Sequence, residues 1–145
     1  MKSIHILLIE DNEGDVVLTT EALSDGRITN TISVAKDGWE AIQYLEKQGI
    51  YIDAVKPDII LLDINLPKMN GHEVLKRIKS NNAINNIPVV IITSSSSEKD
   101  ISESYRNYAH SFITKPIDIG AFLKVVASIK NMGINIVQLS GKNNI

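Results

Sequence analysis

The chain has 145 residues, with 15 basic and 17 acidic side chains and no cysteine. This length suits a single domain with its own core, and the lack of cysteine excludes disulfides, zinc–thiolate sites and thiol catalysis. The near balance of charge argues against a general binder of nucleic acids or anionic membranes. No apolar run approaches the ~18 residues of a membrane-spanning helix or has the form of a signal peptide. We therefore expect one soluble, cytoplasmic domain.

Five short apolar runs predict strands. Three are continuous and rich in Ile and Val, as in strands buried on both faces of a parallel sheet. These are Ile4–Ile9, Ile59–Leu62 and Val89–Ile92. Two weaker runs, Thr31–Ala35 and Ser111–Thr114, predict edge strands.

Helical patterns lie between these strands. We expect Asp15 to cap the first helix and Gly26 to end it. Asp37 is expected to cap the second helix, which ends near Gly49, and the third begins at Gly71.

Two further helices follow the fourth and fifth strands. The fourth is predicted over residues 98–109, with Ile101, Tyr105 and Tyr108 on one face. The fifth has an apolar stripe at helical spacing, formed by Ile119, Phe122, Leu123 and Val126.

Strand–helix alternation, repeated five times, predicts an α/β fold with a doubly wound, five-stranded parallel sheet. The flavodoxin-like strand order 2-1-3-4-5 fits, because it puts the three continuous runs in the centre and the weaker runs at the edges. We expect residues 1–130 to form this domain and residues 131–145 a C-terminal extension, with no separate output domain. Residues 47–57 make a long exit from the second helix, and Ile134–Leu139 could add a strand.

Acidic, hydroxyl and basic side chains follow the strands. Ligands of such sheets bind beyond the carboxyl ends of the strands, where the strand order reverses. The order reverses between the first strand, followed by Glu10 and Asp11, and the third strand, followed by Asp63. Thr93 and Lys115 end the fourth and fifth strands, so we expect all five side chains around one crevice.

The charges of this crevice predict its chemistry. Three carboxylates repel one another unless they are protonated or neutralised. A divalent cation together with Lys115 would balance them, and carboxylates with few other protein ligands suit Mg²⁺. An aspartate at such a metal can attack phosphorus and form an aspartyl phosphate. The Thr93 hydroxyl can then donate a hydrogen bond to a phosphoryl group on Asp63.

Four motifs give the chain a family resemblance over residues 4–130. They are ILLIEDN (6–12), DIILLDINLPKMNG (58–71), VVIITS (89–94) and FITKP (112–116). On these motifs the chain resembles the receiver domain of two-component response regulators. The stretches EDNEGD, INLPKMNGHEVLKRIK and SFITKPIDIGAFLKVVASI are similar to small stand-alone regulators of bacterial phytochrome-type histidine kinases.

The resemblance implies a role for each motif residue. Asp63 corresponds to the phosphoacceptor, Glu10 and Asp11 to the metal-binding acidic pair, and Asn65 would give the metal a backbone carbonyl. Thr93 corresponds to the switch hydroxyl.

The FITKP motif completes the resemblance. Lys115 corresponds to the lysine that pairs with the phosphoryl group, aimed by a cis peptide bond to Pro116, and Phe112 to the switch aromatic residue. The family often has a second Asp where Glu10 stands and a Tyr where Phe112 stands. Without the phenol, one hydrogen bond of the inward-turned ring is lost.

The resemblance also implies a function. A histidine kinase would donate a phosphoryl group to Asp63, and the face made by the fourth helix, fifth strand and fifth helix would then bind a second copy or a downstream partner. Tyr105, Tyr108 and Ile134–Leu139 could contribute to that face. We expect no turnover of an external substrate, only phosphoryl transfer from phosphohistidine and self-catalysed dephosphorylation.

Other readings compete with these assignments. Thr93 could be an ordinary strand residue and Phe112 a core residue. The loop Ser94–Ser97 could be merely flexible, or it could close on the phosphoryl group. We expect the three histidines to be structural or at the surface, because none ends a strand; they are His5, His72 and His110.

Two other functional classes are less well supported. A phosphatase with an aspartate nucleophile would carry a second Asp two residues on, where this chain has Asn65, and it would need length for a substrate cap. A flavin or nucleotide module would need a Gly-rich phosphate loop after the first strand. The loop here is acidic and would repel phosphate in the absence of a metal.

Overall fold

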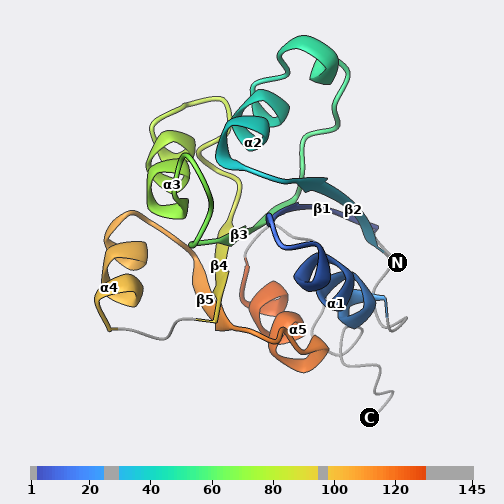
Figure 1. The fold of residues 1–145 in the computed structure, drawn as a ribbon, viewed down its shortest axis with the longest axis vertical. Helices are drawn as coiled ribbons and strands as arrows, with labels where there is room; N and C mark the ends of the chain where they lie inside the picture. Colours follow the sequence, from blue (N-terminus) through green and yellow to red (C-terminus); the bar gives the residue numbers. More distant parts are fainter. Residues whose placement is uncertain (1–2, 25–29, 95–97, 130–145) are drawn as a thin grey trace.

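The computed structural model describes residues 3–24, 30–94 and 98–129 (Figure 1). All five predicted strands and all five helices are present. In chain order the elements are β1 (Ile4–Ile9), α1 (Glu13–Leu23), β2 (Asn30–Ala35), α2 (Gly38–Leu45), the 3₁₀ helix η1 (Gly49–Tyr51), β3 (Ile59–Asp63), α3 (Gly71–Lys79), β4 (Val89–Thr93), α4 (Glu98–Arg106), β5 (Ser111–Thr114) and α5 (Ile119–Ser128).

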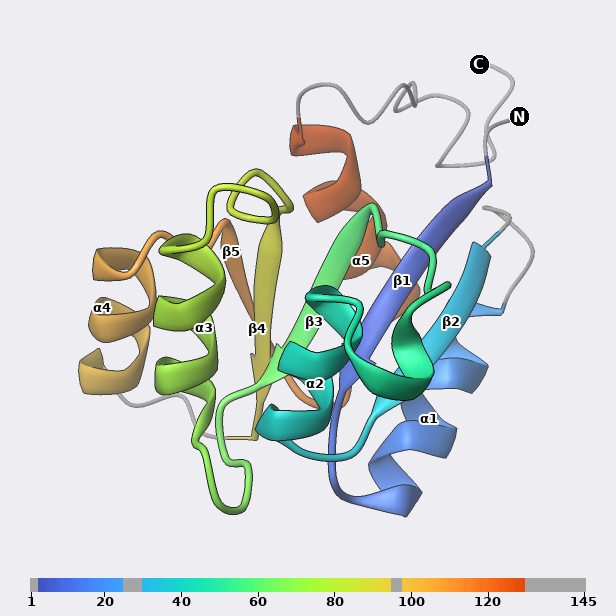
Figure 2. The same cartoon turned by 90° about the horizontal axis from the view of Figure 1, so that it is seen from above.

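The strands form one parallel sheet in the order β2-β1-β3-β4-β5, which confirms the predicted topology. Helices α1 and α5 cover one face, while α2 and α3 cover the other with α4 beside α3 (Figure 2). The central strands β1, β3 and β4 are therefore covered on both sides. This is why their sequences read as unbroken apolar runs rather than as alternating patterns.

Alternate residues of the central strands feed two cores. Leu7 and Leu62 lie in the cluster beneath α2 and α3, whereas Leu8 and Leu61 lie in the cluster beneath α1 and α5. All four side chains are fully buried. Each such side chain contributes about 1.5–3 kcal/mol relative to an exposed one, so both layers hold the strand ends in place.

The first helix begins earlier than predicted. Asn12, not Asp15, is its N-cap: the Asn12 side chain accepts a hydrogen bond of 2.9 Å from the backbone N–H of Asp15. The helix ends at Leu23, and Gly26 lies outside the described residues. The predicted cap was wrong because Asn and Asp are both good N-caps and both stand near the start of this helix. Sequence alone did not show which of the two residues caps it.

The second helix has the predicted cap but a different end. Asp37 accepts a hydrogen bond of 2.8 Å from the Glu40 backbone, as expected. The helix nevertheless ends at Leu45, not near Gly49, because Lys47 turns the backbone with a φ of 55°. The third helix begins at Gly71, as predicted.

The fourth helix also differs from the prediction. It ends at Arg106, and Tyr108 follows with a left-handed φ of 70°. Tyr105 and Tyr108 are 50% and 76% exposed, so the predicted apolar face is not the buried one. Ser104 is buried instead, and its hydroxyl donates to the backbone oxygen of Asp100 at 2.8 Å.

The long exit from α2 is tied to the domain by two tyrosines. Tyr44 donates a hydrogen bond of 3.1 Å to the backbone oxygen of Val55, and Tyr51 donates one of 2.7 Å to Glu40. Residues 131–145, including the possible strand Ile134–Leu139, lie outside the described residues. None of the helices in the described part of the chain has the length and apolar character that a membrane crossing requires.

Candidate functional site

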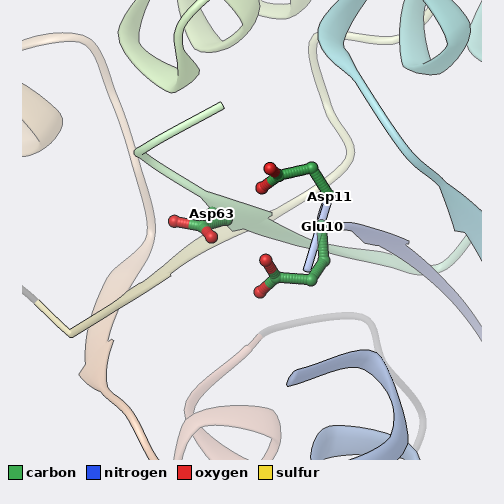
Figure 3. A group of neighbouring side chains, drawn as sticks. All are labelled: Glu10, Asp11 and Asp63. Atoms are coloured by element: carbon green, nitrogen blue, oxygen red, sulfur yellow. The ribbon is translucent and has the colours of Figure 1, made fainter. Parts of the chain in front are cut away.

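Three carboxylates meet at the carboxyl ends of β1 and β3 (Figure 3). The sheet register pairs Ile9 with Leu62, so the next residue of each segment, Glu10 or Asp63, comes to the same level. Asp11 follows at the end of β1, and ligand oxygens of the three residues lie within 4.8 Å of one another. Glu10 and Asp63 are buried, whereas Asp11 is exposed. The predicted acidic group is thus assembled at the sheet's switch point.

Burial and the crowding of the carboxylates shift the pKa of Glu10. Burial, together with the nearby Asp63 carboxyl, raises the pKa of Glu10 to about 7, although Lys115 acts in the opposite direction. Its buried oxygen Oε1 has no hydrogen bond of acceptable geometry among residues 3–24, 30–94 and 98–129, although Lys115 Nζ lies 2.5 Å away. Such a crowded carboxylate is stabilised by added positive charge.

Lys115 is the cation at the centre of the site. Its Nζ donates hydrogen bonds of 2.9 Å to Asp63 and 2.8 Å to Asp15, in addition to its contact with Glu10. Burial opposes the charged form, but the bonds to these carboxylates raise the pKa of Lys115. Lys115 is therefore an ammonium held over the Asp63 carboxylate.

Asp15 is a site residue that the sequence motifs did not predict. We expected it to cap the first helix, but its carboxylate accepts a hydrogen bond from Lys115, which lies 100 residues further along the chain. The sequence did contain an indication of this role. Asn12 is itself a good N-cap, and a helix capped by Asn12 has Asp15 in its first turn, close to the carboxyl ends of the strands.

Asn65 and Thr93 connect β3 with β4. The Asn65 backbone N–H donates to Asp63 Oδ1 at 2.9 Å, and its side-chain amide donates to Thr93 Oγ1 at 3.2 Å. Thr93 is fully buried, and its backbone oxygen accepts a hydrogen bond of 2.8 Å from the Lys115 N–H. Asn65 and Thr93 therefore both lie beside the cluster of Glu10, Asp11 and Asp63.

Phe112 lies within β5, two residues before the end of that strand. It is half-buried and packs against the core cluster beneath α2 and α3. The peptide bond between Lys115 and Pro116 is cis, as the resemblance implied.

The histidines are structural or at the surface, as predicted, and in the described part of the chain none belongs to the cluster of Glu10, Asp11 and Asp63. His5 is hydrogen-bonded to Tyr44 at 2.9 Å, His72 lies 3.5 Å from Asp100, and His110 is exposed.

Close backbone packing fixes the loop behind Asp63. A Cβ added at Gly71 would lie 2.5 Å from the Cα of Ile64 and 2.7 Å from the backbone oxygen of Asp63. The Gly71 N–H also donates to the Ile64 oxygen at 2.9 Å. Only glycine allows α3 to begin this close to the end of β3, so Gly71 positions the Asp63 loop.

The donor set fits a hard divalent cation. Carboxylate oxygens come from Glu10, Asp11 and Asp63, and the Asn65 backbone carbonyl follows two residues after Asp63. Oxygen donors of this kind suit Mg²⁺ or Mn²⁺. With a lysine beside the buried carboxylate, the arrangement can stabilise negative charge that is transferred to Asp63.

The response regulator receiver domain family matches residues 6–127 of the chain. Response regulator Rcp1 of Synechocystis sp. is 37% identical over 134 residues, which are 92% of this chain and 91% of that protein. Similarity over nearly the whole of both chains goes beyond a shared sheet topology.

Solved structures are also similar. The bacteriophytochrome response regulator AtBRR has 39% identity and a TM-score of 0.78 over 87% of this chain and 91% of that one. The phosphorylated cyanobacterial phytochrome response regulator RcpA has 38% identity and a TM-score of 0.77 over 98% of both chains. The Mn²⁺-bound form of Rcp1 has 36% identity and a TM-score of 0.76, covering 91% of this chain and 97% of that one. By sequence and by fold, this chain belongs to the response regulator receiver domain family.

Proposed function

We propose that the protein accepts a phosphoryl group on Asp63 from a partner histidine kinase, in a Mg²⁺-dependent reaction, and signals through a change of its own surface. The observation that carries the proposal is the buried Asp63 carboxylate, 2.9 Å from the Lys115 ammonium and grouped with two more carboxylates. The similarity to RcpA, whose structure is of the phosphorylated protein, supports the same role here. The bacteriophytochrome and phytochrome regulators among its relatives support a phytochrome-type kinase as partner.

The metal would be held by Glu10, Asp11, Asp63 and the backbone carbonyl of Asn65. When bound, it supplies positive charge to the phosphoryl oxygens. The similar Rcp1 has been solved with Mn²⁺, which supports a divalent cation at these residues. We assign Mg²⁺ to this chain because carboxylate donors with open positions for water suit that ion.

The transfer is a substitution at phosphorus. A carboxylate oxygen of Asp63 forms the new P–O bond as the P–N bond to the kinase histidine breaks, and the electron pair of that bond stays on the imidazole nitrogen. Lys115 holds the acceptor and neutralises charge on the phosphoryl oxygens. Hydrolysis of the acyl phosphate at the same site returns Asp63 to its carboxylate, so no external substrate is turned over.

The signal leaves through the face of α4, β5 and α5. The Thr93 hydroxyl is buried beside Asp63 and can donate a hydrogen bond to a phosphoryl oxygen. Movement of Thr93 frees space that the half-buried Phe112 ring can enter from the neighbouring strand β5. A shift of α4 and β5 then alters a surface that carries exposed Tyr105 and Tyr108 and forms a homodimer contact.

The receiver unit spans residues 1–130 in this proposal, and residues 131–145 follow it in the sequence. A kinase that makes its phosphohistidine from ATP acts in the cytoplasm, so the proposed exchange takes place there.

Intact-mass measurement tests the proposal. Incubation with acetyl phosphate and Mg²⁺ should add about 80 Da to the protein, the mass of one phosphoryl group. Asp63→Asn should abolish the adduct, and Asp11→Asn should abolish its Mg²⁺-dependent formation. Asp53→Asn, which changes an exposed aspartate in the exit from α2, should label like the wild type. An adduct that persists in Asp63→Asn contradicts the proposal.

A further inference from the structure

Two helices begin with the same pattern but use it differently. Asn70 and Glu73 at the start of α3 lie three positions apart, as do Asn12 and Asp15 at the start of α1. In α3 the two residues form a complete capping box. The Asn70 side chain accepts a hydrogen bond of 3.0 Å from the Glu73 N–H, and the Glu73 side chain accepts one of 3.3 Å from the Asn70 N–H.

In α1 only half of the capping box forms. Asn12 accepts from the Asp15 N–H at 2.9 Å, but the Asn12 N–H donates to Glu10 Oε2 at 3.2 Å. The Asp15 carboxylate is therefore not used by the cap. It lies on Lys115 instead, with Oδ2 2.8 Å from Nζ.

The other carboxylate neighbours of Lys115 belong to the acidic group. Glu10 and Asp63 are both members of that group, whereas Asp15 is not. If a metal engages Glu10 and a phosphoryl group occupies Asp63, Lys115 must give up both contacts in their present form. Among the carboxylates that contact Lys115 in the described part of the chain, Asp15 is the one that neither event involves.

We propose that Asp15 is a positioning residue for phosphoryl transfer, and that its carboxylate holds the Lys115 ammonium beside Asp63. A lysine has a flexible four-carbon stem, and an ammonium without a fixed acceptor would sample many positions. Asp15 lies in the first turn of α1, and the N-cap of that helix, Asn12, donates its backbone N–H to Glu10. The start of α1 is therefore tied to the carboxylate cluster, and this places the Asp15 acceptor oxygen relative to it. The inference rests on the proposed function of Asp63.

The test compares Asp15→Ala and Asp15→Asn, because the asparagine keeps an acceptor oxygen and the alanine does not. Asp15→Ala should slow labelling by acetyl phosphate about tenfold or more, the size expected when a reacting group loses its alignment. Asp15→Asn should stay within about threefold of the wild type. Glu73→Ala removes the matching acid of α3 and should leave the labelling rate unchanged.

A direct readout reports on the lysine itself. The ¹H–¹⁵N signal of the Lys115 ammonium, recorded with saturating Mg²⁺ and without acetyl phosphate so that a metal would engage Glu10 and Asp63, should be present in the wild type and in Asp15→Asn because the residue at position 15 still holds its protons. It should broaden beyond detection in Asp15→Ala. This measurement does not depend on phosphoryl transfer.

The outcomes separate the two proposals. Absence of an adduct on the wild-type protein contradicts the function of Asp63. An adduct on the wild type that forms equally fast in Asp15→Ala overturns the role of Asp15 alone. Equal slowing in Asp15→Asn and Asp15→Ala, with the Lys115 signal intact in both, also overturns it, because the lysine would then be held without Asp15.

Discussion

The side-chain amide of Asn65 donates a 3.2 Å hydrogen bond to Oγ1 of Thr93. The same residue donates its backbone N–H to Asp63 Oδ1 at 2.9 Å. Asn65 therefore contacts both the proposed acceptor carboxylate and the buried hydroxyl at the end of β4. A change of charge on Asp63 can thus reach Thr93 through the hydrogen bonds of a single residue, Asn65.

Substitution of Thr93 tests whether its hydroxyl transmits the signal. Thr93→Ala should still form the adduct on Asp63, but amide signals in α4 and β5 should no longer shift on labelling. Thr93→Ser keeps the hydroxyl and should keep the shifts. The comparison uses ¹H–¹⁵N spectra with and without acetyl phosphate and Mg²⁺. If Thr93→Ala responds like the wild type, the signal does not pass through this hydroxyl.

The raised pKa of Glu10 predicts pH-dependent metal binding. Below about 7 the folded, metal-free protein keeps a proton on Glu10, which a divalent cation must displace. The apparent affinity for Mg²⁺ should therefore rise with pH and level off above about 7. Titration calorimetry in two buffers of different ionisation enthalpy would measure the released proton. An affinity that does not change with pH would contradict the assignment of Glu10 as a ligand.

The same group predicts how metal-free stability varies with pH. The pKa of Glu10 is about 7 in the folded protein and 4.5 in an unperturbed chain, so the folded state binds the proton more tightly. The contribution of Glu10 to the free energy of unfolding is thus full below 4.5 and is lost as pH rises through about 7. Glu10→Gln should remove this slope from denaturant titrations, and Mg²⁺ should flatten it in the wild type.

The strands of this protein were readable from the sequence, whereas two helix ends were not. Runs such as Val89–Ile92 were placed to within one residue, because burial on both faces leaves no polar position within the run. The ends of α2 and α4 were misplaced because Lys47 and Tyr108 occupy left-handed positions where glycine is usual. Nothing in those two side chains marks the end of a helix.

The candidate site divides in the same way. Glu10, Asp11 and Asp63 followed from topology, since parallel strands bring their carboxyl ends to one edge. The role of Asp15 did not follow from topology, because its partner Lys115 lies 100 residues away in the sequence. Only the folded structure shows that the Asp15 carboxylate pairs with Lys115 and does not cap the helix. Packing contacts such as that of Gly71 on Ile64 were equally invisible in the sequence.

Gly71 gives a stability prediction that also reaches the site. In Gly71→Ala the new Cβ would lie 2.5–2.7 Å from backbone atoms of Ile64 and Asp63. No change of side-chain rotamer can relieve this clash, because the contacted atoms belong to the backbone. The free energy of unfolding should fall by about 2 kcal/mol or more, and labelling of Asp63 should slow. Gly120→Ala is the control, since its nearest contact is the Asp118 side chain at 3.1 Å. Equal stability of the two variants in urea titrations would contradict the close approach.

Tyr108 gives the opposite prediction for a glycine substitution. Its φ of 70° follows the end of α4, where the Ala109 N–H donates to the Ser104 oxygen at 3.0 Å and closes the helix. A side chain in this conformation costs free energy that glycine avoids, and the 76% exposed ring buries little that would be lost. Tyr108→Gly should therefore raise the free energy of unfolding by about 0.5–1 kcal/mol. Tyr105→Gly, also exposed but inside the helix, should lower it by about 0.5 kcal/mol. If both variants lose stability in thermal or urea unfolding, the left-handed backbone at Tyr108 carries no strain.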